Sequence, residues 1–293
     1  MSVRWEDLAA ESRAFYARRG PRRGPSSAPE LHTARERMPP PVAAVPPARP
    51  AVVHALGREV PVRVHVPTSR PVAGVHLEVH GGGFVIGSAA HDDVRCRALA
   101  EATGLVVVGV EHRLAPEHPW PAAPDDVETA ARWLVDVAVD RFETDRLTVG
   151  GFSSGATLAL GTSLRLRDAG VDAFSGAALQ FGTYDLSGTT PAGRLIADEF
   201  FLGAYLGPGT DRTRPDVSPV LADLTRLPPV LLVVGADDVL LADNRAMAER
   251  IAAAGGSVEL SVYPASPHGF TGHDTSMAAA ARADVAAWLG SLR

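Results

Sequence analysis

The amino-acid sequence predicts an α/β protein with a mostly parallel, doubly wound central sheet and a small helical cap. Three observations support this fold class. Short runs rich in β-branched residues alternate with longer helical patterns through most of the chain. Several of the strand-like runs are apolar almost throughout, which is typical of a sheet covered on both faces. The length of 293 residues is within the range of one α/β domain.

The N-terminal part is expected to lie outside the sheet. Met1 to about Gly20 has the pattern of an amphipathic helix, whose apolar residues near one face are Val3, Leu8, Ala9, Phe15 and Tyr16. Residues Met38–Pro50 are rich in proline, which lacks an amide donor and fixes φ, so they predict an extended connector. The β-rich runs at 51–56 and 60–66, separated by Gly-Arg-Glu, then predict a hairpin.

The rest of the chain predicts the sheet and its helices. Strands are expected at 72–80, 104–112, 146–150, 176–181, 229–235 and 257–263, and helices at 125–139, 154–168, 242–254 and 276–292. An excursion rich in Gly, Pro, Thr and Asp interrupts this alternation, and we expect it to cap the strand ends, where functional loops lie in such sheets. One domain is therefore predicted, in four segments: N-terminal cap helices and linker (1–45), first part of the core (46–184), cap insertion (185–217) and second part of the core (218–293).

Composition excludes some classes of partner. A net charge of −6 and a pI near 5.9 give no electrostatic basis for binding nucleic acid. A short group of arginines is diluted by acidic neighbours and is interpreted as a solvated face: Arg18, Arg19, Arg22 and Arg23. The single cysteine, Cys96, excludes an intramolecular disulfide and is interpreted as a small buried hydrophobe. With no leader pattern and no apolar run of membrane-spanning length, the chain is expected in the cytoplasm; the sequence leaves open whether it forms a homodimer.

The stretch Gly151-Phe152-Ser153-Ser154-Gly155 has the pattern G-x-S-x-G between an expected strand and an expected helix. A sharp strand-to-helix turn of this kind holds a serine hydroxyl above the sheet, and its flanking glycines avoid collisions. Ser153 is then the candidate nucleophile, and the backbone N–H of Ser154 would help to bind an oxyanion. The alternative is an ordinary turn.

A serine hydroxyl needs a base to take its proton and an acid to orient that base. The turn predicts the chain order serine, acid, histidine, with each partner after a later strand. Asp237 and Asp238 follow one expected strand, and His268 follows the next. His273 is a rival base further into the loop, and Glu259 is a rival acid within a strand. The residue types alone do not decide between Asp237 and Asp238.

The run HGGGF at His80–Phe84 follows another expected strand. Three glycines let the backbone approach a substrate closely and direct its amides at it. Such a loop could instead hold phosphate, but no Lys-Ser/Thr follows and the glycine spacing is not that of a phosphate-binding loop. An oxyanion hole is therefore the favoured interpretation.

Together these segments resemble the hormone-sensitive lipase family of α/β-hydrolases, in its bacterial esterase and acetyl-hydrolase branch. The matching segments are HGGGF, EHRLAPEHPWPAAPDD, GGFSSGATLA, SPVLADLTRLPPVLLVVGADDVLLADNRAMAERI and PHGF. The resemblance implies the α/β-hydrolase fold and hydrolysis of carboxylic esters through an acyl-enzyme, without a cofactor or a metal. It implies Ser153 as nucleophile, Asp238 as acid and His268 as base. The oxyanion amides would come from Gly82, Gly83 and Ser154. Within RLAPEHPWP, Arg113 and Glu117 are interpreted as structural residues that pin a loop.

The chain departs from the family pattern at several positions. Phe152, Ser154 and Ala156 replace an Asp, an Ala and a Gly of the usual turn, His112 replaces a Tyr, and Val239 and Ala242 replace a Pro and an acid. The nucleophile and the backbone donor survive these changes, so the reaction class is expected to be kept, while the substrate scope is open.

Aromatic residues are the candidates for lining a substrate pocket: Phe84, Phe152, Phe200, Phe201 and Tyr205. The cap aromatics could equally pack the cap onto the sheet. The expected substrates are esters with a short acyl chain, from acetyl to about hexanoyl. Two other activities are open on this fold, namely an amide deacetylase of a biosynthetic pathway and a non-catalytic small-molecule receptor. A dehydratase is a weaker alternative, because its nucleophile tends to be threonine.

Overall fold

A computed structural model describes residues 5–20 and 23–292, and these residues contain an eight-stranded sheet. Its strands are β1 (Arg49–Ala55), β2 (Arg58–His65), β3 (Gly74–Val79), β4 (Leu105–Val110), β5 (Leu147–Phe152), β6 (Ala177–Gln180), β7 (Val230–Gly235) and β8 (Val258–Tyr263). Their order across the sheet is β1-β2-β4-β3-β5-β6-β7-β8. The β1–β2 hairpin is antiparallel and joins β4 antiparallel, whereas all pairs from β4 to β8 are parallel. The predicted fold class is confirmed.

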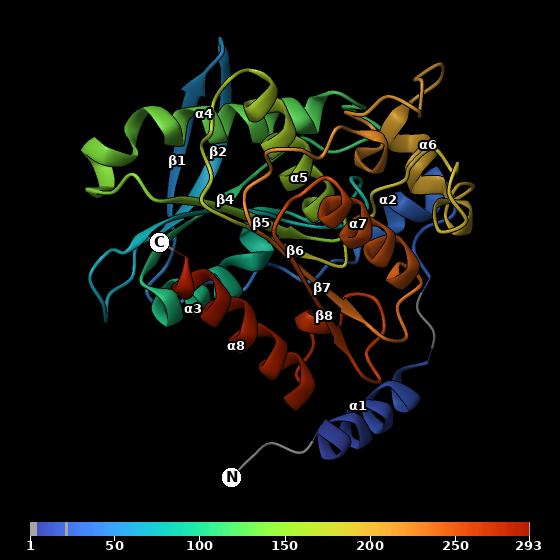
Figure 1. Cartoon of the computed structure of the whole chain (residues 1–293). Helices are drawn as coiled ribbons and strands as arrows, with labels where there is room; N and C mark the ends of the chain where they lie inside the picture. The colour runs from blue at the N-terminus through green and yellow to red at the C-terminus, as the bar shows by residue number, and fades with distance from the viewer. Residues whose placement is uncertain (1–4, 21–22, 293) are drawn as a thin grey trace.

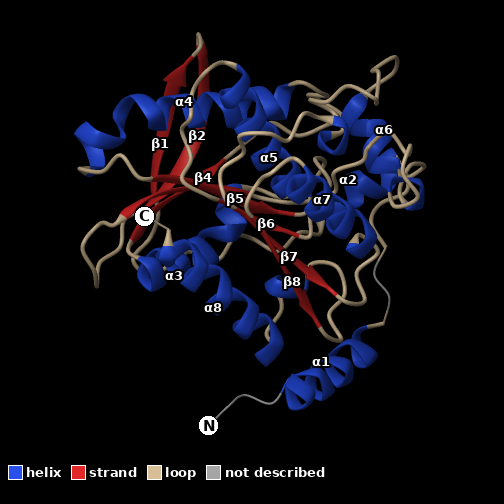
Figure 2. Cartoon of the chain, in the orientation of Figure 1, coloured by secondary structure: helices blue, strands red, loops and turns tan. Residues whose placement is uncertain are grey.

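Helices cover both faces of the sheet (Figures 1 and 2). The helices α4 (Ala122–Phe142), α5 (Ser154–Asp168) and α7 (Leu241–Ala253) pack on one face, and α3 (Asp93–Thr103) and α8 (Ser276–Ser291) pack on the other. Because alternate residues of a strand point to opposite faces, β3 sends Val75, Leu77 and Val79 into the apolar core beneath α4 and α5. Its other residues, including His76 and Glu78, are buried on the opposite face.

The N-terminal segment forms two helices. The first is α1 (Trp5–Arg19). Val3 of the predicted apolar face and Arg22 of the arginine group lie outside the described residues. The second is α2 (Ala28–Glu36), a helix that was not predicted above. The sequence contains a pattern typical of a helix start, Ser-x-x-Glu, and Ser27 caps the helix by accepting the N–H of Glu30.

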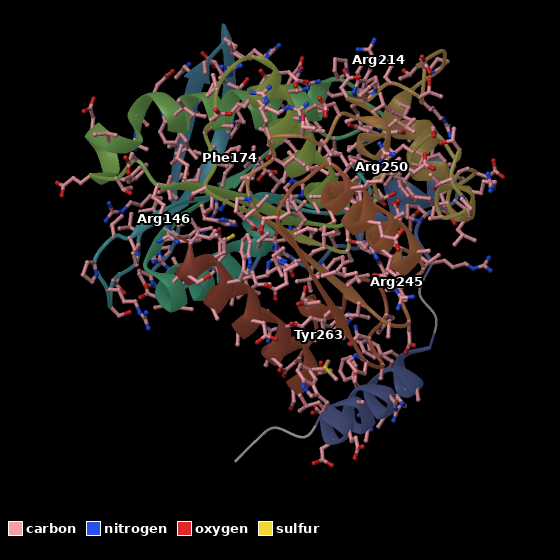
Figure 3. The ribbon with its side chains drawn as sticks, in the orientation of Figure 1. Arg146, Phe174, Arg214, Arg245, Arg250 and Tyr263 are labelled. Atoms are coloured by element: carbon pink, nitrogen blue, oxygen red, sulfur yellow. The ribbon has the colours of Figure 1, made fainter. Side chains whose placement is uncertain are left out.

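The α1 helix is fastened to the C-terminal part of the chain. Ser12, which is 1% exposed, donates its hydroxyl to the carbonyl of Ala265 at 2.5 Å. Tyr263, labelled in Figure 3 at the end of β8, contacts two helices. Its ring lies 5.9 Å from that of Trp5 in α1, and its hydroxyl donates to Asp284 of α8 at 2.7 Å.

The cap helix α6 (Phe200–Leu206) and α2 both contact the loop that follows β3, and they lie at the same end of the molecule in Figure 1. Arg35 of α2 donates to the carbonyl of Val85 at 2.8 Å. Tyr205 of α6 stacks on Phe84, with ring centroids 3.8 Å apart. Segments distant in sequence thus converge on the HGGGF loop.

The structure confirms two structural interpretations. Arg113 pairs with Asp126 at 2.7 Å and Glu117 pairs with Arg35 at 2.7 Å, so both residues pin the loop between β4 and α4. Cys96 is 2% exposed, and burial raises the pKa of its thiol. In the part of the chain that the structure describes, no helix is both long and apolar enough to cross a bilayer.

Asp243, in the first turn of α7, ties this helix to the segment after β6. Its carboxyl is buried and accepts the N–H of Tyr184 at 2.6 Å. Burial raises the pKa of Asp243 to about 6, and the backbone hydrogen bonds only partly oppose this. A carboxyl whose pKa is higher in the folded chain stabilises the fold at low pH, and this contribution is lost as the pH rises through the folded pKa.

Replacing Asp243 with Asn keeps an acceptor for the N–H of Tyr184 but removes the ionisation. We expect the free energy of unfolding of Asp243→Asn, measured relative to wild type, to increase by on the order of 1 kcal/mol between about pH 5 and about pH 8. Urea unfolding of both proteins at the two pH values measures this change. A difference that does not vary with pH would contradict the assignment.

Candidate active site

The turn between β5 and α5 holds Ser153 in a strained conformation. Its φ of 53° and ψ of −126° lie outside the regions that a residue with a side chain usually adopts. The Ser153 N–H donates to the carbonyl of Gln180 at 2.8 Å, and its own carbonyl accepts the N–H of Ala156 at 3.0 Å. The backbone is therefore held on both sides of the strained residue.

Two glycines let this turn approach the end of β3. A Cβ built on Gly155 would lie 2.1 Å from the carbonyl oxygen of Val79, and one on Gly151 would lie 2.6 Å from the same oxygen. Neither position has room for a side chain. The two flanking glycines of the sequence pattern are thus explained by backbone packing at both positions.

Ser153, His268 and Asp238 form one hydrogen-bonded line. The Oγ of Ser153 lies 2.9 Å from Nε2 of His268, and Nδ1 of His268 lies 3.0 Å from Oδ2 of Asp238. Asp238 is 6% exposed, and its Oδ1 also accepts the N–H of Leu240 at 2.8 Å. Because an ionised carboxylate only accepts hydrogen bonds, Nδ1 carries the hydrogen and Nε2 is left to accept the serine proton.

Topology explains why these distant residues meet. Asp238 follows β7 and His268 follows β8, and these strands are parallel neighbours. The carboxyl ends of parallel strands lie at one edge of the sheet, where β5 also delivers Ser153. The rivals lie elsewhere: Asp237 and Glu259 are exposed, and Nδ1 of His273 is hydrogen-bonded to the hydroxyl of Tyr16 at 2.8 Å.

The loop after β3 presents backbone amides beside this line. Gly82 has a φ of 120° and Gly83 a φ of 61°, and a Cβ on Gly82 would lie 1.8 Å from the carbonyl oxygen of Ile86. Within residues 5–20 and 23–292, the N–H groups of Gly82, Gly83 and Ser154 donate to no protein acceptor. Ser154 is the first residue of α5, where amides have no partner within the helix. Such amides are suited to binding an oxyanion.

A family model described as the α/β-hydrolase fold matches residues 76–272. The chain belongs to this family. It is 35% identical to the carboxylesterase NlhH of Mycobacterium tuberculosis over 243 residues, covering 77% of this chain and 75% of that protein. It is 35% identical to an acetyl-hydrolase of Streptomyces hygroscopicus over 197 residues, covering 64% of this chain and 65% of that protein.

The solved structure of an esterase from Pyrobaculum calidifontis superposes with a TM-score of 0.78 at 25% identity, covering 99% of this chain and 94% of that one. The family, the relatives and this structure support a carboxylesterase-type hydrolase. They also confirm the resemblance to the hormone-sensitive lipase-like esterases on which the sequence analysis relied.

The HGGGF loop of this hydrolase rests on two stacked imidazoles that no sequence pattern indicates. The rings of His80 and His112 are parallel and 4.0 Å apart. Nδ1 of His80 donates to the carbonyl of Gly81 at 2.9 Å. Burial lowers the pKa of both histidines, so two neutral rings can pack face to face without repulsion. His112 thus fills the position of the usual family Tyr with another flat ring.

The aromatic candidates for the substrate pocket fall in different places. Phe201 overhangs the HGGGF loop, because a Cβ on Gly83 would lie 3.3 Å from its ring. Phe84 and Tyr205 are stacked and almost fully buried, at 1% and 3% exposure, which supports the packing alternative for Tyr205. Phe200 lines a separate cavity of about 530 Å³ with Ala28 of α2.

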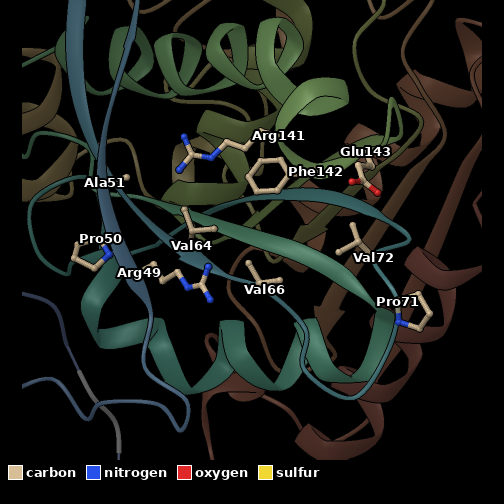
Figure 4. A pocket seen from close by; sticks show the side chains of 10 residues that line it. All are labelled: Arg49, Pro50, Ala51, Val64, Val66, Pro71, Val72, Arg141, Phe142 and Glu143. Carbon is tan, nitrogen blue, oxygen red and sulfur yellow. The ribbon is translucent and has the colours of Figure 1, made fainter.

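A further cavity lies away from the triad. It has a volume of about 560 Å³ and is lined by Arg49, Pro50, Ala51, Val64, Val66, Pro71, Val72, Arg141, Phe142 and Glu143 (Figure 4). These residues come from β1, β2, the segment between β2 and β3, and the end of α4, and Ser153, His268 and Asp238 are not among them.

A protein with alanine at a given position is usually more stable than one with glycine there, and the strain at Ser153 predicts the opposite order of stability at this position. Ser153→Gly and Ser153→Ala both remove the hydroxyl and differ only in the Cβ. We expect the glycine variant to be the more stable by about 1 kcal/mol, because glycine adopts this φ without cost. Thermal unfolding of the two variants measures the difference.

Gly161, inside α5 with open space around it, is the control. There, Gly161→Ala should stabilise the protein by roughly 0.5–1 kcal/mol, since alanine has the higher helix propensity. A Ser153→Ala variant more stable than Ser153→Gly would show that the turn is not strained.

Proposed function

We propose that this hydrolase cleaves short-acyl carboxylic esters through an acyl-enzyme formed on Ser153. The observation that carries the proposal is the line from Asp238 through His268 to the Ser153 hydroxyl, in which Nε2 of His268 faces Oγ at 2.9 Å. A base within hydrogen-bond distance of the nucleophile, itself oriented by a buried acid, is the arrangement that activates a serine.

In the first half of the reaction, Nε2 of His268 takes the hydroxyl proton while Oγ of Ser153 attacks the ester carbonyl carbon. Asp238 holds the Nδ1–H and offsets the charge of the imidazolium. The N–H groups of Gly82, Gly83 and Ser154 would donate to the oxyanion of the tetrahedral intermediate. The intermediate collapses when His268 returns the proton to the leaving alcohol, and the acyl group stays on Oγ.

In the second half, water takes the place of the alcohol. His268 removes a proton from the water as its oxygen adds to the acyl carbonyl, and the same amides bind the second oxyanion. The ester bond to Oγ then breaks, Ser153 regains its proton from His268 and the carboxylic acid leaves. Every proton that moves passes through Nε2 of His268, whether it comes from Ser153 or water or goes to the alcohol or Ser153, and no step of this cycle uses a metal or a cofactor.

The preference for short acyl chains is supported by the position of Phe201. Its ring lies beside Gly83, one of the proposed oxyanion donors, so it would restrict the space next to the acyl carbonyl. Phe201 is the cap aromatic that we propose as a wall of the substrate pocket.

Three broader points stay predictions. The four-segment division of the domain is consistent with the positions of α2 and α6. The cytoplasmic location is consistent with the single cysteine, which excludes an intramolecular disulfide. The homodimer has no structural support in a single chain. Cleavage of amides is the alternative activity, because the same triad can attack both kinds of carbonyl.

Removal of the nucleophile or the base tests the mechanism. We expect Ser153→Ala and His268→Ala each to lower kcat by about a millionfold, because the hydroxyl and its base act as one unit. Hydrolysis of p-nitrophenyl acetate measures this loss, and a parallel amide panel compares the two activities. A fluorophosphonate probe should label Ser153 in wild type and not in Ser153→Ala. Full activity in Ser153→Ala would reject the site.

Acyl-chain preference tests the proposed wall. Along a series of p-nitrophenyl esters, kcat/KM should be highest between acetyl and hexanoyl. Phe201→Ala should shift the optimum toward longer chains. We expect the ratio of kcat/KM for a longer ester to kcat/KM for a shorter one to rise by the equivalent of roughly one to three kcal/mol, the range associated with space for added methylenes. Leu195→Ala, which changes an exposed residue of the cap, is the control and should leave the optimum in place. A wild-type optimum beyond decanoyl would refute the preference.

A further inference from the structure

Phe152, the residue before the nucleophile, makes a contact that the triad mechanism does not use. The guanidinium carbon of Arg95, in the first turn of α3, lies 3.8 Å from the centre of the Phe152 ring. The same ring packs against the oxyanion loop, where a Cβ on Gly81 would lie 2.7 Å from a ring carbon. One ring therefore touches a cation and the loop while its backbone leads into Ser153.

Two acidic side chains hold Arg95 in place. Its Nη2 donates to Oε1 of Glu78 at 2.8 Å and lies 3.5 Å from Oδ2 of Asp92. The other carboxylate oxygen of Glu78 accepts a hydrogen bond from Nε2 of His76 at 2.9 Å. The Glu78 side chain is 6% exposed, so this ion pair is largely shielded from water.

Both partners of this pair are ionised at neutral pH. Burial works against the charge on Glu78, but Arg95 and His76 outweigh it and hold the pKa of the carboxyl below its ordinary value. Burial also works against the charge on Arg95, while Asp92 and Glu78 raise its pKa. The Phe152 ring therefore faces a permanent cation that is paired with two carboxylates, and its electron-rich face is attracted to that cation.

The ring also reaches the catalytic base through one more aromatic residue. The ring centroids of Phe152 and Phe181 are 6.3 Å apart with an interplanar angle of 61°. The rings of Phe181 and His268 are 5.1 Å apart at 74°. Edge-to-face contacts of this geometry are attractive, so a row of rings connects Arg95 to the imidazole of the triad.

We propose that Arg95 is a positioning residue for ester hydrolysis, which acts through Phe152 to fix the nucleophile turn against the oxyanion loop and through Phe181 to orient His268. This inference rests on the proposed roles of Ser153 and His268. Arg95 supplies no proton and forms no bond to substrate. Arg95 keeps the nucleophile turn and His268 in fixed positions relative to the oxyanion loop while charge develops on the oxyanion. Its loss should therefore affect kcat more than KM.

The test removes the cation and keeps the aliphatic stem. At a temperature well below the melting point of each protein, we expect Arg95→Met to lower kcat by about tenfold and to change KM by less than about twofold. Arg95→Lys restores a cation and should recover part of the loss. Phe152→Leu should cause a similar loss, and the double variant should be no worse than Phe152→Leu alone, because both substitutions remove the same contact.

Two further variants separate positioning from folding. Arg95→Met leaves the buried carboxylate of Glu78 without its arginine, which can prevent folding. The double variant Glu78→Gln/Arg95→Met removes both charges, and it replaces the single variant in the kcat measurement if the single variant does not fold. Arg97→Met is the matched control, because Arg97 is a second arginine of α3, buried, that donates instead to the carbonyls of Val66 and Pro46. It should lower the melting temperature and leave kcat unchanged.

A wild-type kcat in both Arg95→Met and the double charge variant would overturn the inference, whatever their melting temperatures. A rise in KM with unchanged kcat would also overturn it, as would losses that multiply when Arg95→Met and Phe152→Leu are combined. These outcomes are distinguishable from failure of the proposed function, which would appear as retained hydrolysis in Ser153→Ala while Arg95 is intact.

Discussion

The site depends on the close approach of the β5–α5 turn to the end of β3. Gly155 and Gly151 lie against the carbonyl oxygen of Val79, and this contact brings the strained Ser153 beside the loop that carries Gly82 and Gly83. Ser153 and these two glycines thus follow adjacent parallel strands, β5 and β3, whose register fixes their spacing. Strain of this kind persists only where the surroundings over-determine the backbone, and the neighbouring strands β3 and β6 supply that support.

The two faces of the sheet contribute in different ways. The face beneath α4 and α5 is apolar and supplies non-directional stabilisation, which fixes the layers but not the angles of individual side chains. The face beneath α3 buries His76 and Glu78, and the partly exposed Arg95 pairs with Glu78 there. Hydrogen bonds and ion pairs are directional, so this polar face can set the orientation of the residues that end at the site.

The cap segments act on one loop. Arg35 of α2 binds the carbonyl of Val85, and α6 places Phe201 and Tyr205 over the same stretch. The stacked His80 and His112 support this loop from within the core. The loop is thereby held from both sides. Rigid support of this kind suits the proposed role of its amides, because preorganised donors need no rearrangement as charge develops during the reaction.

The sequence by itself determined the α/β class, most strand and helix positions, and the strand-to-helix turn around Ser153. These follow from local patterns: strands that are apolar throughout, helical periodicity, and glycines flanking one serine. The sequence also named Asp238 and His268 through family resemblance, but residue types alone left Asp237 and His273 as rivals. It passed over α2, whose capping signal lies in a segment rich in glycine and proline.

Only the tertiary structure decided which side chains meet. The hydrogen bonds of His268 to Ser153 and Asp238 join residues far apart in the chain, and so does the contact of His273 with Tyr16. The same holds for Phe152, which the family resemblance marks as a replaced Asp and the structure shows as a ring packed on the guanidinium of Arg95. Local patterns report the period of an element and the face it buries, whereas contacts between elements depend on strand order and on the path of the loops, which no short segment encodes.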